Sequence, residues 1–304
     1  MFTDKAIIKE LVDTLLQRQV TLYHACQLVD FESYLQIGGI PSRKTLEESG
    51  LPYTGFDTDE IDKKNEVWDK VFVNLQDFGW TFSNGDGATP NTFGPILIKI
   101  NPKSLNIAKD ISITLRSAGA MDFDRNKESL NTIEEVDNLF SYPIKDGFPK
   151  TLYIKWKKDL QNDFKNPSAR SPEINCTYPK GILPLDYFTC IYVDPYVFSN
   201  HPLYVEVNDI IKNNNLTLPY RLRNCKSEDQ TRMYSEIGSL LINETPSFDQ
   251  IEKMNNPSAD LLTWINKLRE FKLDWQFKRY GDYLRNGTIK KVLERYGNSS
   301  ENSC

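Results

Sequence analysis

The stretch Leu22–Arg43 reads LYHACQLVDFESYLQIGGIPSR, and it decides how the rest of the chain is interpreted. It predicts a short strand that carries His24 near its end, then a helix that Asp30 can cap and that Gly38-Gly39 can end. An imidazole fixed in this way can hydrogen-bond a ribose hydroxyl, and a nearby glycine lets the backbone approach a ligand closely. A structural histidine and an ordinary helix stop give the same pattern, so both interpretations stay open.

The composition is that of a folded chain. It has 304 residues, 39% of them hydrophobic and 26% charged, which excludes disorder throughout. The 37 Lys and Arg against 42 Asp and Glu give a net charge of −5, which excludes a generally cationic nucleic-acid coat but permits local basic surfaces. The five cysteines are scattered, so we expect no metal site and free thiols, as in a reducing cytoplasm. No apolar run reaches about 18 residues and the N-terminus is unlike a signal peptide, so no membrane segment is expected.

Strand and helix patterns follow one another irregularly along the chain. Apolar runs predict strands at 71–75, 96–100, 111–115, 188–193 and 203–207, and a strand or strand–helix junction at 231–242. Amphipathic patterns predict helices at 3–19 and from 260 onward. Because there is no regular βα repeat, we predict an α+β fold.

The sequence lacks the motifs of several common enzyme classes. There are only two histidines, His24 and His201, and neither lies near a GxSxG elbow. A GxxxxGK[ST] phosphate loop is missing, and so is a GxGxxG fingerprint after a strand. The sequence therefore gives no support for a serine hydrolase, an ordinary NTPase or a Rossmann dehydrogenase.

The opening stretch resembles the start of the DarT family of ADP-ribosyltransferases, which reads LYHITHxxNLxSILxxGGL. The matching residues, without gaps, are Leu22–Cys26, Asp30, Phe31, Ser33, Leu35 and Gly38–Ile40. Weaker matches follow in the family's order: Gly50–Tyr53 to GLPY, Ile61–Lys64 to IKxRR, Val71–Val73 to a strand with VPFYF, Thr114–Ala118 to TDxNA, and Arg232–Ile237 to the RxxxAEFLV segment that holds the catalytic Glu. The resemblance implies a split, mixed β-sheet with flanking helices and a cleft for NAD.

This resemblance also divides the chain. It implies that residues 1–142 form the N-terminal part of a transferase core and 225–259 its C-terminal part with the catalytic Glu. Between them, 143–224 has no counterpart in the family and is interpreted as an insertion that is basic at its start. Residues 260–304 are interpreted as a basic helical tail.

NAD is the substrate that the resemblance implies. His24 would hydrogen-bond a ribose of NAD, and Ala25 and Cys26 would offer backbone groups to the nicotinamide amide. Cys26 stands where the family has Thr, so a hydroxyl contact is replaced by a weak thiol. Ser33 and Ile40 fall at further NAD-contacting positions. The alternatives are a solvated helix residue for Ser33 and a core residue for Ile40.

By the same resemblance, Glu236 is the candidate catalytic carboxylate, because a lone Glu in an apolar, strand-like run could stabilise an oxocarbenium-like state. We expect Tyr23 and His24 to face it across the NAD cleft. Lys64 takes the place of the family arginine thought to act at the target base, and it can supply a charge but no bidentate fork. Its alternative is an exposed Lys in an acidic segment. Arg43 is a further candidate, for a pyrophosphate contact.

The family modifies bases in single-stranded DNA, so the resemblance implies a nucleic-acid acceptor. Lys155, Trp156, Lys157 and Lys158 combine cations with an aromatic ring, as single-strand grooves do. The basic tail around Trp264–Tyr280 has similar residues, but an amphipathic helix with a buried Trp face explains them equally. RNA is a serious alternative to DNA, and a protein acceptor comes third.

Two classes of function therefore stay open. The first is a mono-ADP-ribosyltransferase toxin that acts on nucleic acid, for which the resemblance implies an antitoxin partner and a role in phage defence. The second is a non-catalytic nucleic-acid-binding protein on a decayed transferase fold. The departures at Cys26 and Lys64 favour the second function, whereas the presence of His24 and Glu236 opposes it.

Overall fold

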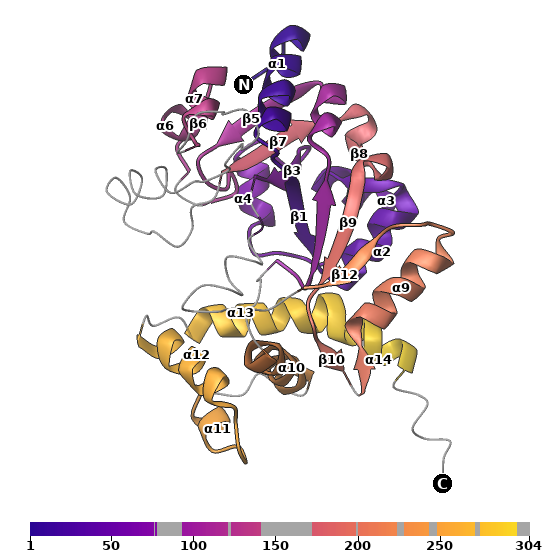
Figure 1. Ribbon diagram of the computed structural model, residues 1–304, viewed down its shortest axis with the longest axis vertical. Helices are drawn as coiled ribbons and strands as arrows, with labels where there is room; N and C mark the ends of the chain where they lie inside the picture. The colour runs from indigo at the N-terminus through magenta and orange to yellow at the C-terminus, as the bar shows by residue number, and fades with distance from the viewer. Residues whose placement is uncertain are drawn as a thin grey trace.

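The structure is a computed structural model, and it describes residues 1–75, 77, 93–120, 123–140, 172–198, 200–223, 228–242, 248–270 and 274–296. Its strands are β1 (Leu22–Cys26), β2 (Gly39–Pro41), β3 (Val71–Asn74), β4 (Ile96–Ile100), β5 (Asp110–Thr114), β6 (Ser129–Leu130), β7 (Glu173–Thr177), β8 (Ile182–Pro184), β9 (Phe188–Val193), β10 (Val197–Phe198), β11 (His201–Pro202) and β12 (Tyr220–Leu222). Strands and helices are mixed without a βα repeat, so the predicted α+β class is confirmed (Figure 1).

The α-helices are α1 (Lys5–Gln17), α2 (Leu28–Ile37), α3 (Arg43–Ser49), α4 (Asp59–Lys64), α6 (Arg125–Glu128), α7 (Ile133–Asp137), α9 (Leu203–Asn213), α10 (Glu228–Ile242), α11 (Phe248–Glu252), α12 (Ala259–Glu270), α13 (Asp274–Leu284) and α14 (Lys290–Tyr296). Short 3₁₀ turns are η1 (Pro102–Ile107), η3 (Pro179–Gly181) and η4 (Leu185–Tyr187), and η5 (Arg285–Ile289) is a π-helical turn. None of these described helices is long and apolar enough to cross a membrane.

A mixed eight-stranded sheet organises the molecule, in the order β12-β9-β4-β1-β3-β7-β5-β6. Only β12 and β9 run parallel, and the other neighbours are antiparallel. The sheet is narrowest at its centre, where Tyr23 of β1 and Asn74 of β3 form the single pair that joins the two strands. Beyond that pair, the ring Nδ1 of His24 lies 2.8 Å from the carbonyl oxygen of Phe72. A side chain thus takes the place of a ladder bond at the boundary between the two halves.

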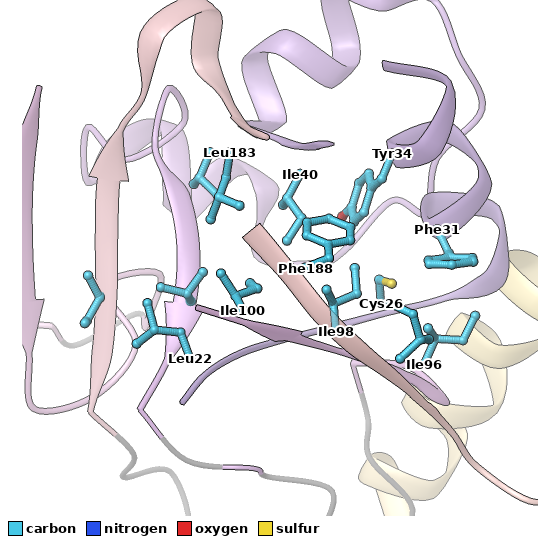
Figure 2. Close-up of a cluster of buried hydrophobic side chains, with 14 of the residues drawn as sticks. Leu22, Cys26, Phe31, Tyr34, Ile40, Ile96, Ile98, Ile100, Leu183 and Phe188 are labelled. Carbon is cyan, nitrogen blue, oxygen red and sulfur yellow. The ribbon is translucent and has the colours of Figure 1, made fainter. Parts of the chain in front are cut away.

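One face of the sheet is apolar. It carries Leu22 and Cys26 of β1 together with Ile96, Ile98 and Ile100 of β4, and Figure 2 shows them against Phe31 and Tyr34 of α2. Each of these side chains is at most 5% exposed. Since successive strand residues point to opposite faces, Tyr23 and Lys99 lie on the other face, whereas His24, paired with Ile98, lies on the apolar face beside Tyr34. Directly paired residues place Lys99, Tyr23, Asn74, Glu173 and Thr114 in one row across five strands of that second face.

The helix after β1 begins three residues earlier than Asp30 would place it. Gln27 is the N-cap, and the Asp30 carboxylate reaches back to accept a hydrogen bond from the Gln27 N–H, 3.3 Å away, in a capping box. Gly38 ends the helix with a φ of 93°, as the sequence predicts, because this left-handed conformation costs glycine little.

Three predictions from the sequence are wrong. Residues 203–207 belong to helix α9, and 231–242 belong to helix α10, because their apolar residues recur at helical spacing rather than in alternation. The described part of 143–224 is not an insertion: it supplies β7, β9 and β12 to the central sheet. The strands expected at 71–75, 96–100, 111–115 and 188–193 are present with ends shifted by at most one residue.

The C-terminal helices pack against the start of α2. The Thr288 hydroxyl donates to Gln27 Oε1 at 2.7 Å and accepts from the Leu28 N–H at 3.1 Å. The neighbouring Gly287 lies so close that an added Cβ would be 2.4 Å from Thr54 Oγ1 and 2.6 Å from Gln27 Cβ. The π-helical turn therefore packs directly against the junction between β1, which carries His24, and α2.

We expect Gly287→Ala to destabilise the protein by about 1–3 kcal/mol, because the new methyl group overlaps side chains that cannot move freely in a packed interior. Urea unfolding measures the change in free energy. Gly55→Ala is the control, because an added Cβ there has no neighbour within 4 Å. Equal effects of the two substitutions would contradict the close packing at Gly287.

Candidate functional site

Glu173 is a buried carboxylate in the middle of the polar face. It begins β7, stands opposite Asn74 on one side and Thr114 on the other, and is 8% exposed. Its Oε1 accepts a hydrogen bond of 3.0 Å from the N–H of Ala118. Burial raises the pKa of Glu173 to about 7, with a further contribution from the negative charge of Asp62. This carboxyl therefore titrates near neutral pH.

A second carboxyl lies beside it. Burial raises the pKa of Asp62, in α4, to about 7, and nearby Asp59 raises it further while Arg43 opposes the shift. A Cβ at Gly119 would stand 2.1 Å from Asp62 Oδ1, so the backbone of this loop passes directly against the carboxyl. Asn65 fixes the same loop through a 2.7 Å hydrogen bond to the Ala118 carbonyl. Two acids with raised pKa values thus lie against the same Ala118–Gly119 loop.

The imidazole of His24 is neutral at physiological pH. Burial lowers its pKa to about 4, in spite of its hydrogen bond to the Phe72 carbonyl, and the charge of Arg43 lowers it further. Because that carbonyl can only accept, Nδ1 carries the proton, and the Tyr34 hydroxyl, 3.3 Å from Nε2, donates to the other nitrogen. A ligand that bonds Nε2 has to replace Tyr34 as its partner.

Arg43 is the charged group that acts on both His24 and Asp62. Its Nη2 donates to the Thr54 carbonyl at 2.6 Å and to both carboxylate oxygens of Asp59 at 3.0–3.1 Å. Its guanidinium also lies over the ring of Tyr53, 4.8 Å from the centroid. Since its charge acts on the pKa values of both His24 and Asp62, these groups form one electrostatic region.

The remaining residues expected to contact NAD have different surroundings. Ala25 is half-buried in β1, whereas Cys26 is 2% exposed in the core, where burial raises the pKa of its thiol. Ser33 is buried and donates to the Pro52 carbonyl at 2.5 Å. Ile40 is fully buried and pairs with Leu183, which is the core environment that was its alternative. The side chains of Cys26 and Ile40 therefore point into the hydrophobic core.

The two residues assigned to catalysis from the sequence lie in different helices, Lys64 in the same short helix as Asp62 and Glu236 in α10. Glu236 belongs to helix α10, not to a strand, and it accepts a hydrogen bond of 3.1 Å from the Ser258 N–H and lies 3.8 Å from Arg232. Lys64 is exposed at the end of α4. Within the described residues, no hydrogen bond or ion pair joins Glu236 to His24, whose partners are Phe72 and Tyr34.

The predicted nucleic-acid contacts are only partly described. Lys155, Trp156, Lys157 and Lys158 lie outside the described residues. In the tail, Trp264 is 5% exposed and belongs to the core, so its ring is not presented to a base.

Basic side chains of the tail pair with acids of the fold: Arg269 with Asp249 and Glu252, Arg279 with Asp57, Lys291 with Glu32, and Arg295 with Glu206. This arrangement matches the amphipathic-helix alternative.

Glu173 was missed by the sequence interpretation, which matched Arg232–Ile237 to the family segment that holds the catalytic Glu. The available signal was alternation. In Glu173–Thr177 (EINCT), polar Glu173 and Asn175 alternate with apolar Ile174 and Cys176, which is typical of a strand with one buried apolar face.

No protein-family model matches the chain, and no curated protein matches it either. Solved structures of DarT from Thermus sp. 2.9 do match: in complex with NAD+ (TM-score 0.39), with ADP-ribosylated single-stranded DNA (0.40) and with carba-NAD+ (0.38), each at 12% identity. The matches cover 67%, 69% and 67% of this chain and 94%, 95% and 95% of the DarT chain, respectively. Nearly all of DarT is thus covered, while part of this chain is left unmatched.

The raised pKa of Glu173 predicts how stability depends on pH. The folded state holds the proton more tightly than the unfolded state, so this group's contribution is present below about pH 4.5 and is lost as the pH rises through about 7. We expect Glu173→Gln, which stays neutral, to gain up to about 3 kcal/mol relative to wild type at pH 8 compared with pH 5. Urea unfolding at both pH values measures this, with exposed Glu10→Gln as the control. The same difference at both pH values would show that Glu173 is not buried as a carboxylic acid.

Proposed function

We propose that this protein is an NAD-dependent mono-ADP-ribosyltransferase and that Glu173 is its catalytic carboxylate. The observation that carries the proposal is the register that places Glu173 in one row with Tyr23, across the single pair that joins β1 to β3. Tyr23 belongs to the segment whose sequence resembles the opening of the DarT family. Glu236, in helix α10, is the competing candidate.

In this proposal Glu173 acts mainly by electrostatic stabilisation of the transition state. The bond between nicotinamide and ribose C1′ breaks, its electron pair leaves with neutral nicotinamide, and positive charge develops on the ribose. An ionised carboxylate at this point stabilises that charge and accepts a hydrogen bond from a ribose hydroxyl. The acceptor then forms the new bond to C1′, and its proton passes to a base. With a pKa of about 7, Glu173 is able to exchange a proton at neutral pH.

The other site residues take supporting roles in this proposal. The neutral imidazole of His24 and the backbone groups of Ala25 and Cys26 contact NAD, and Ser33 and Ile40 fix the helix and turn behind them. Arg43 supplies the positive charge for the pyrophosphate, although Asp59 now neutralises it. Lys64, exposed at the end of α4, remains a candidate for a contact with the target base.

The acceptor in this proposal is a base in RNA or single-stranded DNA, bound with the help of Lys155–Lys158. A protein acceptor is the alternative. Action as a toxin in a toxin–antitoxin or phage-defence system, in the cytoplasm, belongs to the same proposal and is supported only by the family resemblance.

A non-catalytic nucleic-acid-binding function is the second candidate. It is favoured by one observation: both ring nitrogens of His24 are already hydrogen-bonded within the protein. Incubation of the full chain with labelled NAD and separate DNA, RNA and protein pools distinguishes the two functions. Transfer of label to one pool identifies the acceptor. If the protein neither binds NAD nor transfers label, the second function is supported.

The catalytic carboxylate is tested by a matched pair of substitutions. We expect Glu173→Gln to lower the transfer rate by about 10²–10³, the typical effect of removing one preorganised electrostatic group. Glu236→Gln should stay within a few-fold of wild type. Single-turnover rates with labelled NAD measure both, and NAD binding by calorimetry checks that each site is intact. The opposite order of effects would return the role to Glu236.

The acceptor is tested through salt dependence. Neutralising Lys155, Lys157 and Lys158 together should weaken nucleic-acid binding and flatten its dependence on salt, because fewer counterions are then released. NAD affinity should not change. Trp156→Ala should cost a further 1–3 kcal/mol or so if a base stacks there. Binding of DNA and RNA that is unchanged by the triple substitution would remove this segment from the interface.

A further inference from the structure

Two asparagines flank Glu173 on the polar face. Asn74 stands directly opposite it on β3, and Asn175 follows it by two residues on β7, so all three side chains project from the same face. Cross-strand neighbours of this kind have Cβ atoms about 5 Å apart, and diagonal neighbours about 7–8 Å apart. The two amides and the carboxyl therefore form one compact polar cluster.

Both amides contain a buried atom that no group of the described residues satisfies. Within that part of the chain, Asn74 Oδ1 and Asn175 Nδ2 are buried without a hydrogen-bond partner, and the Asn175 residue is only 2% exposed. Buried polar atoms in native proteins are nearly always paired, so an unpaired atom calls for an explanation. On the opposite face of β7, the apolar side chains of Ile174 and Cys176 are fully buried. Apolar residues can therefore fill the interior of this strand, and packing alone does not explain the presence of two amides.

The unpaired atoms are complementary in kind. Asn74 offers an acceptor and Asn175 offers a donor. A ligand that satisfies both must present a donor and an acceptor close together, as the edge of a carboxamide or of a lactam does. Phe72, half-buried and paired directly with Asn175, adds an aromatic side chain on the same face. An aromatic ring beside an amide is the combination that suits a planar heterocycle.

We propose that Asn74 and Asn175 bind the donor–acceptor edge of a planar heterocycle next to Glu173. This inference rests on the proposed function, since it assigns the cluster to recognition of a transferase substrate. Two substrates contain this chemistry: the carboxamide of the nicotinamide ring of NAD, and the lactam edge of a nucleobase acceptor.

Binding of free heterocycles tests the proposal without any need for catalysis. Calorimetry or ligand-observed NMR with nicotinamide and with each nucleoside monophosphate measures affinity for the wild type, Asn175→Ala and Asn74→Ala. Ser112→Ala is the matched control, because Ser112 pairs with Asn175 from the other side on the same face. We expect at least one heterocycle to bind the wild type and to bind each Asn variant at least ten-fold more weakly, with no change for Ser112→Ala.

The identity of the bound heterocycle separates the two sources. Loss of nicotinamide binding, with a raised KM for NAD and an unchanged KM for the acceptor, assigns the cluster to NAD. Loss of nucleotide binding, with only the acceptor KM raised, assigns it to the base. Asn175→Ser, which keeps a small polar group, replaces Asn175→Ala if the latter does not fold.

Failure of this inference differs from failure of the proposed function. If the wild type transfers ADP-ribose and neither Asn substitution changes any affinity or KM by more than two-fold, the inference is wrong and the function stands. The inference is also wrong if no heterocycle binds the wild type. If heterocycles bind through the two asparagines but NAD is neither bound nor cleaved, the proposed transferase function is wrong and the recognition cluster stands.

Discussion

The period-two alternation of the central strands is the constraint on which the rest of the structure depends. It buries Leu22, Cys26 and their neighbours under α2, and that burial fixes the register of β1 and β4, since a one-residue slip would turn the apolar face to the outside. The same register places Tyr23, Asn74 and Glu173 in one row on the opposite face. The packing of the apolar face thus also aligns the residues of the polar site, and no additional interaction is needed to align them.

The C-terminal helices pack against the start of α2 and also use polar residues for internal contacts. Their basic residues are directed at acids of the fold, as with Lys291 and Arg279, and the Thr288 hydroxyl caps the first turn of α2 at Leu28. A segment whose positive charge suggests nucleic-acid binding is in this way used largely for internal pairing. Charge counted along a sequence identifies a surface only after the internal partners of those charges are known.

Sequence reasoning predicts much of the fold and only part of the site. Local signals were sufficient to predict β1, α2 and the turn at Gly38, because left-handed glycine acts within a few residues, although the N-cap is Gln27 and not Asp30. They failed for α10, whose apolar residues fit a strand or a helix equally until tertiary packing decides. They also failed for Glu173, because the neighbours that define it, Asn74 and Ala118, are brought to it only by sheet pairing.

The polar cluster lowers the stability of the folded protein, and this loss of stability is itself an argument that the cluster has a function. Glu173 and Asp62 are held where burial disfavours their charged forms, and two amide atoms beside them are unpaired. Each of these features reduces stability, and a leucine or valine at such positions would pack at no such cost. Buried ion pairs such as Arg116–Glu128 show that the fold satisfies its charges elsewhere. Two carboxyls with raised pKa values beside two such amides, next to the single pair that joins β1 and β3, are what a site for a polar substrate requires.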